Sequence, residues 1–222
     1  MVEAASSALK SNIEYGPENH FPLENIPYGV FENGQGEKHV CTRIGDFVID
    51  LAVLFAHGAI GGPQFQKVTK NVFDQPSINE FMSLGKEAWH EARVVIQKLF
   101  SKGDTTISEM AFKDCFSYDF KSVKMCMPVD IRDYTDFYSS KNHAYNVGVM
   151  FRGPDNALQP NWLHLPVGYH GRASTVVISG THIIRPKGQV STDQKTPSWS
   201  QCQRLDFELE MGAVLGKGSK LG

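Results

Sequence analysis

The chain lacks the sequence features that mark several large classes of protein. Its four cysteines are widely spaced and form no Cys-x-x-Cys pair. This argues against a disulfide framework or a zinc knuckle, and it favours reduced thiols in a cytosolic protein. The formal net charge is only -2 and no basic run occurs, so nucleic acid and anionic membrane surfaces are poor candidates as main partners.

Long apolar runs and targeting signals are also missing. The N-terminus has no basic stretch followed by an apolar one, so no secretory signal is predicted. The most apolar window, residues 47–60, is interrupted by Asp50 and His57 and is too short to span a bilayer. These absences predict a cytoplasmic protein without a membrane-bound segment.

Short strands joined by tight turns dominate the region after residue 20. Residues 28–31, 39–44 and 46–51 are predicted strands, and Asn33-Gly34-Gln35-Gly36 is a strong turn signal between the first two. We expect a small barrel-like β domain here, preceded by a polar, poorly ordered segment at residues 1–20.

Two helical signals follow. Ser77 and Glu80 match a capping box, in which each side chain satisfies a backbone donor near the other. Apolar side chains at positions 89, 92, 96 and 99 then recur at helical spacing, and Gly103 follows as a stop signal. This stripe is typical of core packing. Pro128 ends the next apolar stretch, so we place a domain boundary there.

The span from Asp133 to Arg152 is rich in carboxylate, phenol, imidazole and guanidinium groups. Ser139-Ser140 is predicted to cap a helix from about Lys141 to Met150, which puts His143 in its first turn and on one face with Val147 and Met150. Such a histidine can face a cleft. A lone histidine on an apolar helix face is, however, more often a hydrogen-bonded core residue than a catalyst, so both interpretations stay open.

Residues 160–172 form an aromatic loop bracketed by proline and glycine, which is typical of a functional loop. Residues 175–178 and 183–184 are predicted strands.

Residues 205–211 alternate between apolar and acidic side chains, which predicts a strand with Glu208 and Glu210 on one face, about 7 Å apart at Cα. The simplest interpretation is an acidic face exposed to water. Adjacent like charges repel, however, and a hard divalent cation would remove that cost. Asp136 would be a third ligand, and His143 could activate water beside the ion. The all-oxygen set disfavours zinc.

Four strings resemble the fumarylacetoacetase family: DYTDFYSSKNH at 133–143, NVGVMFR at 146–152, PNWLHLPVGYHGR at 160–172 and LDFELEM at 205–211. The resemblance runs from about Phe21 to the end of the chain and is looser before Val129. It implies a mainly β (α+β) fold. Residues 21–127 would be an SH3-like barrel with helices, and residues 128–222 the first part of a β-rich catalytic domain.

The resemblance also implies an activity, which is hydrolysis of the carbon–carbon bond of 4-fumarylacetoacetate to fumarate and acetoacetate in tyrosine and phenylalanine breakdown. It implies a divalent cation, Ca²⁺ or Mg²⁺, on Asp136, Glu208 and Glu210. It implies His143 as general base and Tyr138, Arg152 and Tyr169 as the residues that bind the diketo dicarboxylic acid. Family members are usually cytosolic homodimers, so the resemblance implies a homodimer for the full-length protein.

The implied chemistry is consistent with these residue types. Cleavage of a 1,3-diketone by water needs a base that takes a proton from the water. It also needs a cation that stabilises the enolate-like leaving group. The Arg152 guanidinium offers paired donors that match a substrate carboxylate, and tyrosines can donate from an aromatic wall.

The chain departs from the family at its end, because the family's catalytic domain continues well beyond Gly222. That continuation supplies a fourth carboxylate ligand and the groups that stabilise negative charge. The resemblance therefore implies an N-terminal fragment or a truncated gene model that is inactive by itself. Two alternatives stay open: a related acylpyruvate hydrolase or decarboxylase, and a non-catalytic fragment that acts as a binding module.

Overall fold

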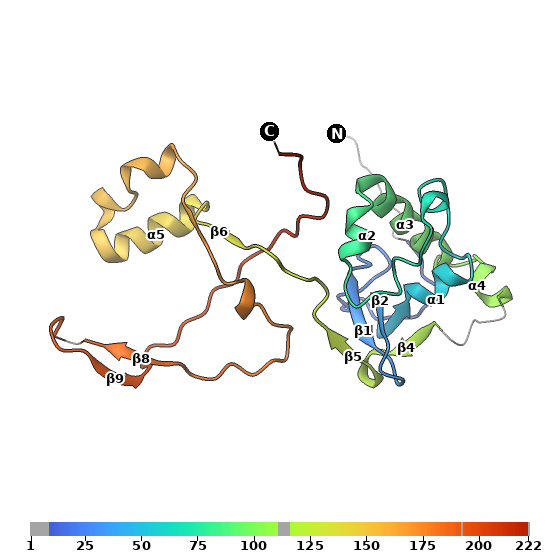
Figure 1. Ribbon diagram of the computed structural model, residues 1–222, viewed down its shortest axis with the longest axis horizontal. Coiled ribbons are helices and arrows are strands. Elements are labelled where there is room, and N and C mark those ends of the chain that lie inside the picture. The colour runs from blue at the N-terminus through green and yellow to red at the C-terminus, as the bar shows by residue number, and fades with distance from the viewer. Residues whose placement is uncertain (1–8, 111–115, 192, 222) are drawn as a thin grey trace. The chain divides into compact units, whose positions relative to one another are not determined.

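The computed structural model describes residues 9–110, 116–191 and 193–221 (Figure 1). These residues divide into two compact units. One unit contains the described residues up to Val129 together with those from Ile178 onward, and the other is Asp130–Val177. Among the described residues, no helix is both long enough and apolar enough to cross a membrane.

A five-stranded antiparallel sheet forms the centre of the first unit, with the strand order β4-β3-β2-β1-β5. The strands are β1 (Tyr28–Glu32), β2 (Lys38–Ile44), β3 (Phe47–Asp50), β4 (Ser117–Asp119) and β5 (Lys124–Cys126). The three strands predicted from the sequence are confirmed as β1, β2 and β3. The predicted turn is confirmed as well, because Gly36 N–H donates to the Asn33 carbonyl at 3.0 Å and closes the β1–β2 hairpin.

Both faces of this sheet are buried, because neighbouring residues of one strand enter different hydrophobic clusters. Val30 on β1 packs into the main core, while Phe31 beside it joins a smaller cluster with Cys41 and Val48. Side chains from the region of the outer strands, including Tyr118 and Met125, pack against that smaller cluster. Since the two edges of the sheet cover the same inner cluster, the sheet is curled into a half-barrel.

Helices complete the main core of this unit. They are α1 (Leu51–Ala56), α2 (Asn79–Ser83), α3 (Lys86–Leu99) and α4 (Thr106–Glu109). The predicted amphipathic helix is confirmed as α3, whose buried stripe is Ala88, Ala92, Ile96 and Leu99. The phenyl groups of Phe73 and Phe81, with ring centroids 5.0 Å apart, help to join this layer to the sheet.

The predicted capping box at Ser77 is wrong. The N-cap of α2 is Ile78, and no side chain caps this helix. The Glu80 carboxylate instead pairs with the Lys70 ammonium at 2.6 Å, and the Ile78 N–H donates to the Pro128 carbonyl. A tertiary ion pair has therefore replaced the local hydrogen bond that the sequence pattern predicts.

Residues 9–20 belong to the segment that we expected to be poorly ordered, yet they make defined contacts. Ile13 and Tyr15 pack against the main core, and the Tyr15 hydroxyl accepts a hydrogen bond from Leu23 N–H at 2.9 Å. The Asn12 N–H donates to the Phe100 carbonyl. One isoleucine and one tyrosine side chain in a polar segment are enough to hold it against an apolar surface.

Beyond Val177 the regular structure is sparse. The described strands of this part are β8 (Lys187–Val190) and β9 (Ser198–Gln201), which pair as a hairpin. The predicted strands at 175–178 and 183–184 are wrong: residues 173–175 form a 3-10 turn, and Ile183 and Ile184 are exposed in irregular backbone. A strand needs a partner for its backbone groups, and the described residues offer none at these positions.

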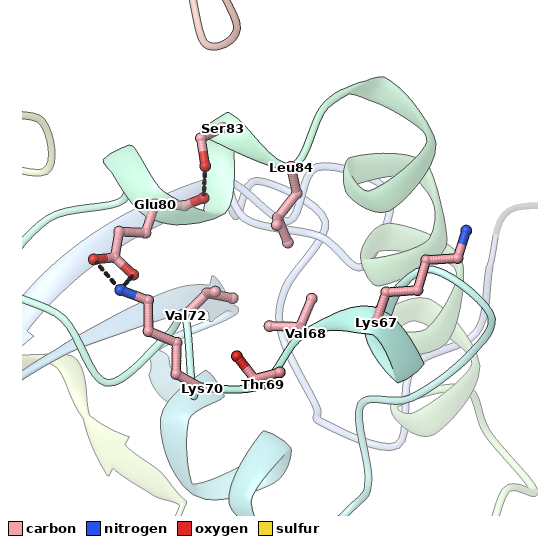
Figure 2. Close-up of a pocket in the computed structure, with 8 residues that line it drawn as sticks. All are labelled: Lys67, Val68, Thr69, Lys70, Val72, Glu80, Ser83 and Leu84. Carbon is pink, nitrogen blue, oxygen red and sulfur yellow. Dashed lines mark hydrogen bonds and ion pairs between the residues drawn. The ribbon is translucent and has the colours of Figure 1, made fainter.

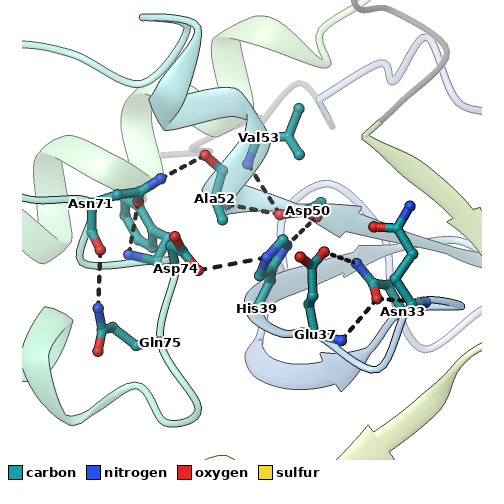
Figure 3. A network of polar contacts seen from close by, with 11 residues as sticks. Asn33, Glu37, His39, Asp50, Ala52, Val53, Asn71, Asp74 and Gln75 are labelled. Atoms are coloured by element: carbon teal, nitrogen blue, oxygen red, sulfur yellow. Dashed lines mark hydrogen bonds and ion pairs between the residues drawn. The ribbon is translucent and has the colours of Figure 1, made fainter.

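A buried carboxylate joins β2, β3 and α1 (Figure 3). The Asp50 side chain is completely buried, and its Oδ1 atom accepts from the N–H groups of Ala52 and Val53 as the N-cap of α1. Its Oδ2 atom lies 2.7 Å from Nδ1 of His39. Burial raises the pKa of Asp50, and the hydrogen bond and charge of His39 only partly offset that effect.

We expect Asp50→Ala to lower the free energy of unfolding by about 1–3 kcal/mol, because it removes an N-cap and leaves buried donors without an acceptor. Asp50→Asn keeps one acceptor for the helix and should cost less. Chemical denaturation of both variants at pH 7 checks this order. Equal stability of the wild type and the alanine variant would contradict it.

The same carboxyl predicts a pH dependence. Because its pKa is raised in the folded state, its contribution to stability is largest below the ordinary carboxyl pKa. The contribution is lost as the pH rises through the window between the ordinary value and the raised one. We therefore expect the wild type to lose stability relative to Asp50→Asn across this window. Denaturation curves between pH 3 and 7 measure the difference, and the opposite slope would refute the assignment.

Candidate active-site ribbon

A two-stranded antiparallel ribbon in the second unit carries two of the predicted site residues. β6 (Thr135–Phe137) pairs with β7 (Gly168–His170) so that Asp136 lies directly opposite Tyr169. Directly opposed residues have their side chains on the same face, with Cα atoms about 4.5–5.5 Å apart. The Asp136 carboxyl and the Tyr169 phenol therefore share one face of this ribbon. Tyr169 is 51% exposed.

Tyr138 joins this ribbon to the following helix. Its N–H donates to the Val167 carbonyl at 2.7 Å, which extends the ribbon by one residue, and its carbonyl accepts from the Trp162 indole at 2.9 Å. Its hydroxyl donates to the Ala144 carbonyl at 3.3 Å. The sequence analysis assigned Tyr138 only to substrate binding and missed this structural role. The sequence feature that could have indicated this role is the aromatic loop at 160–172, because it contains Trp162, whose indole binds the Tyr138 carbonyl.

The helix α5 (Lys141–Arg152) starts where the sequence predicts. Ser140 is its N-cap, and the Ser140 hydroxyl accepts from His143 N–H. His143 lies in the first turn, and its imidazole contacts the Tyr138 ring edge to face, with centroids 5.6 Å apart. The predicted face with Val147 and Met150 is only partly right. The buried residues of α5 are Ala144 and Gly148, whereas His143 and Met150 are exposed.

Gly148 lets α5 approach the turn that follows it. A Cβ atom built at this position would lie only 1.8 Å from the carbonyl oxygen of Ala157, so no other residue fits without movement. Ala157 is itself buried. This close contact holds the turn at Pro154–Asn156 (η3) against the helix, which sets the path of the chain toward Trp162.

We expect Gly148→Ala to destabilise the protein by about 1–3 kcal/mol, the usual cost of overpacking, even though alanine is the better helix former. Asn146→Ala, at an exposed position of the same helix, is the matched control and should be nearly neutral. Thermal unfolding compares them. A stabilised Gly148→Ala protein would show that the helix and the turn are not in contact.

Arg152, at the end of α5, already has hydrogen-bond partners in its own unit. Its Nε donates to the Asn156 carbonyl at 3.0 Å and its Nη2 to the Ala157 carbonyl at 2.7 Å. A guanidinium has five N–H donors, so it can hold this turn and still offer donors to a carboxylate. The predicted substrate-binding role therefore stays a prediction.

The predicted strand at residues 205–211 is wrong. These residues are in irregular backbone, and Phe207, Leu209 and Met211 are 91%, 97% and 96% exposed. The Phe207 N–H donates to the Asp206 side chain rather than to a neighbouring strand. No strand of the described residues pairs with this stretch, and an extended backbone becomes a sheet strand only through ladder hydrogen bonds to a neighbouring strand. Glu208 and Glu210 belong to this exposed stretch.

The chemistry of the predicted ligands suits a hard divalent cation, since Asp136, Glu208 and Glu210 supply only carboxylate oxygens. The described part of the chain does not, however, gather three His, Cys, Asp or Glu side chains in an arrangement that could hold a metal ion. The three carboxylates remain a prediction as a set.

A shallow pocket of about 440 Å³ lies elsewhere, on the first unit (Figure 2). Its apolar lining is Val68, Val72 and Leu84, and at its rim the Lys70 ammonium is neutralised by the Glu80 carboxylate. None of the predicted site residues lines this pocket. It therefore offers no support for the predicted chemistry.

The sequence matches two family models, one after the other. The model described as fumarylacetoacetase N-terminal matches residues 24–128, and the model described as fumarylacetoacetate (FAA) hydrolase C-terminal matches residues 133–221. The second match contains every predicted site residue.

Curated relatives agree with the family models. The chain is 50% identical to fumarylacetoacetase of Dictyostelium discoideum over 221 residues, which cover 97% of this chain and 51% of that protein. It is 47% identical to the Bos taurus protein of the same name (96% and 51% covered) and 46% identical to that of Homo sapiens (96% and 51% covered). We conclude that the chain belongs to the fumarylacetoacetase family. It spans about half the length of the curated relatives it matches.

Proposed function

We propose that this chain provides the water-activating part of an enzyme that hydrolyses a carbon–carbon bond of 4-fumarylacetoacetate to give fumarate and acetoacetate. The observation that carries the proposal is the ribbon β6–β7, on which Asp136 pairs with Tyr169 while Tyr138 contacts the His143 imidazole. A carboxylate, two phenols and an imidazole are thereby supplied by one small unit. The family membership adds the reaction, because the curated relatives are named fumarylacetoacetases.

His143 is the general base in this proposal. The reaction joins the oxygen of water to one ketone carbon and breaks the adjacent carbon–carbon bond, whose electron pair leaves as an enolate. The water must lose a proton as it attacks, and an exposed imidazole at the start of a helix can accept it. The edge-to-face contact with Tyr138 restricts the orientation of the ring.

Tyr138 and Tyr169 position the substrate, and Arg152 pairs with one of its carboxylates. The Tyr138 hydroxyl donates its proton to the Ala144 carbonyl, so toward a substrate it acts as an acceptor. Tyr169 is half exposed and can donate. Arg152 uses the donors that do not hold the Asn156–Ala157 turn.

Asp136, Glu208 and Glu210 are the ligands we propose for Ca²⁺ or Mg²⁺ in a chain of the relatives' length. A bound divalent cation would stabilise the negative charge that develops on the leaving group. Support comes from the donor chemistry and from the family, and no geometry is implied. We further propose a cytoplasmic homodimer, with an SH3-like barrel formed around the curled sheet.

The test of the general base uses a chain extended to the length of its relatives. His143→Ala should lower kcat by about 10²–10⁴-fold, the usual effect of losing a general base, with little change in thermal stability. His164→Ala, at another exposed histidine of the same unit, should keep normal turnover. Loss of the diketone absorbance measures both. A His143→Ala enzyme with normal kcat would remove His143 from the mechanism.

The 222 residues alone should hydrolyse no fumarylacetoacetate, even with Ca²⁺ or Mg²⁺ added. The reason is that the described residues gather no three metal ligands, and Glu208 and Glu210 lie in an exposed irregular stretch. The same absorbance assay on the purified chain checks this expectation. Metal-dependent turnover above background would show that these residues form a working site unaided.

A further inference from the structure

A glycine near the end of the described chain packs against a tryptophan of the first unit. A Cβ atom built at Gly216 would lie 2.6 Å from Cζ2 and 3.0 Å from Cη2 of Trp89, and 3.0 Å from the Met82 carbonyl oxygen. Both segments belong to the same compact unit. The backbone of the C-terminal segment is therefore in direct contact with the corner between α2 and α3.

The surface under this glycine is held rigidly. The Trp89 indole N–H donates to the carbonyls of Phe81 and Met82, at 3.1 Å each, so the ring is fixed across the end of α2. Trp89 also packs against the main core. The fixed indole ring beside α2 therefore offers an apolar contact that a glycine backbone can approach closely.

Gly216 is distinguished from its neighbours by this contact. Its backbone has no positive φ, so conformation does not require glycine there, and only the close approach does. Gly212 and Gly218, on either side, have open space where a side chain would go. Of these three glycines, only Gly216 makes the contact.

We propose that the corner formed by Met82 and Trp89 is a docking surface for this chain's own segment around Gly216, and that the docking anchors the acidic stretch at residues 205–211. Glu210 precedes Gly216 by six positions, so the anchored glutamate can lie no more than about 20 Å from the docking point. The tether raises the effective concentration of this stretch near the first unit. Its relevance to cation binding rests on the proposed function, but the docking itself does not.

The test uses nuclear magnetic resonance of the 222-residue chain. Docking predicts a nuclear Overhauser effect between the Hα atoms of Gly216 and the Hζ2 proton of Trp89. Gly216→Val should abolish the docking, shift the Trp89 indole N–H resonance and lower the heteronuclear NOE of residues 205–211. Gly212→Ala and Gly218→Ala are the matched controls and should leave the Trp89 resonance unchanged. Circular dichroism checks that each variant stays folded.

Two results would overturn the proposal. One is the absence of the Gly216–Trp89 effect in the wild-type chain. The other is a Trp89 resonance that stays in place in Gly216→Val, or that moves equally in all three variants. If Gly216→Val fails to fold, Gly216→Ala gives the same comparison with a smaller side chain. An inactive enzyme would leave these outcomes unaffected, so the docking and the proposed function fail separately.

Discussion

The unit that carries the candidate site depends on the hydrogen bonds of Tyr138. This residue donates from its backbone to Val167, accepts at its carbonyl from the Trp162 indole, and donates from its phenol to Ala144 in α5. One residue, through its backbone and its phenol, thus fixes the end of β6, the aromatic loop and the first turn of the helix. The position of His143 follows from it, because the imidazole packs against the Tyr138 ring. A residue that holds the scaffold in this way keeps the His143 imidazole and the ribbon in a fixed relative position.

Local signals in the sequence were reliable where the structure uses local interactions. The Ser140 cap predicted the start of α5, and the two short predicted strands with the turn signal at Asn33–Gly36 predicted the β1–β2 hairpin. Predictions failed where a distant partner decides the outcome. The capping box predicted at Ser77 does not form, because the Glu80 carboxylate pairs with the Lys70 ammonium instead. The spacing of residues along one helix cannot reveal such an ion pair. Residues 205–211 have the pattern of a strand, but pattern alone supplies no partner strand.

The candidate site also contains features set by local sequence and features set by distant partners. His143 could be placed in the first turn of a helix from the sequence, and the structure has it there. The pairing of Asp136 with Tyr169 joins residues far apart in the chain, so only the resemblance to a family could name both. The buried face of α5 was misjudged because Gly148 counts as neutral in a hydrophobic pattern, although its missing side chain is what lets Ala157 approach. A close approach between two backbone segments is hard to predict from the spacing of apolar residues along the sequence.

The central claim is that the Asp136 ribbon and the Glu208–Glu210 stretch contribute to one cation site in a chain of the relatives' length. The most direct measurement is the affinity for Mn²⁺, a stand-in for Mg²⁺, by electron paramagnetic resonance. We predict that Asp136→Asn, Glu208→Gln and Glu210→Gln each weaken binding by at least the roughly 10–100-fold that loss of an outer-shell partner costs. Asp133→Asn and Asp206→Asn, neighbours with the same charge, should bind as the wild type does. Equal affinities for all five variants would contradict the account.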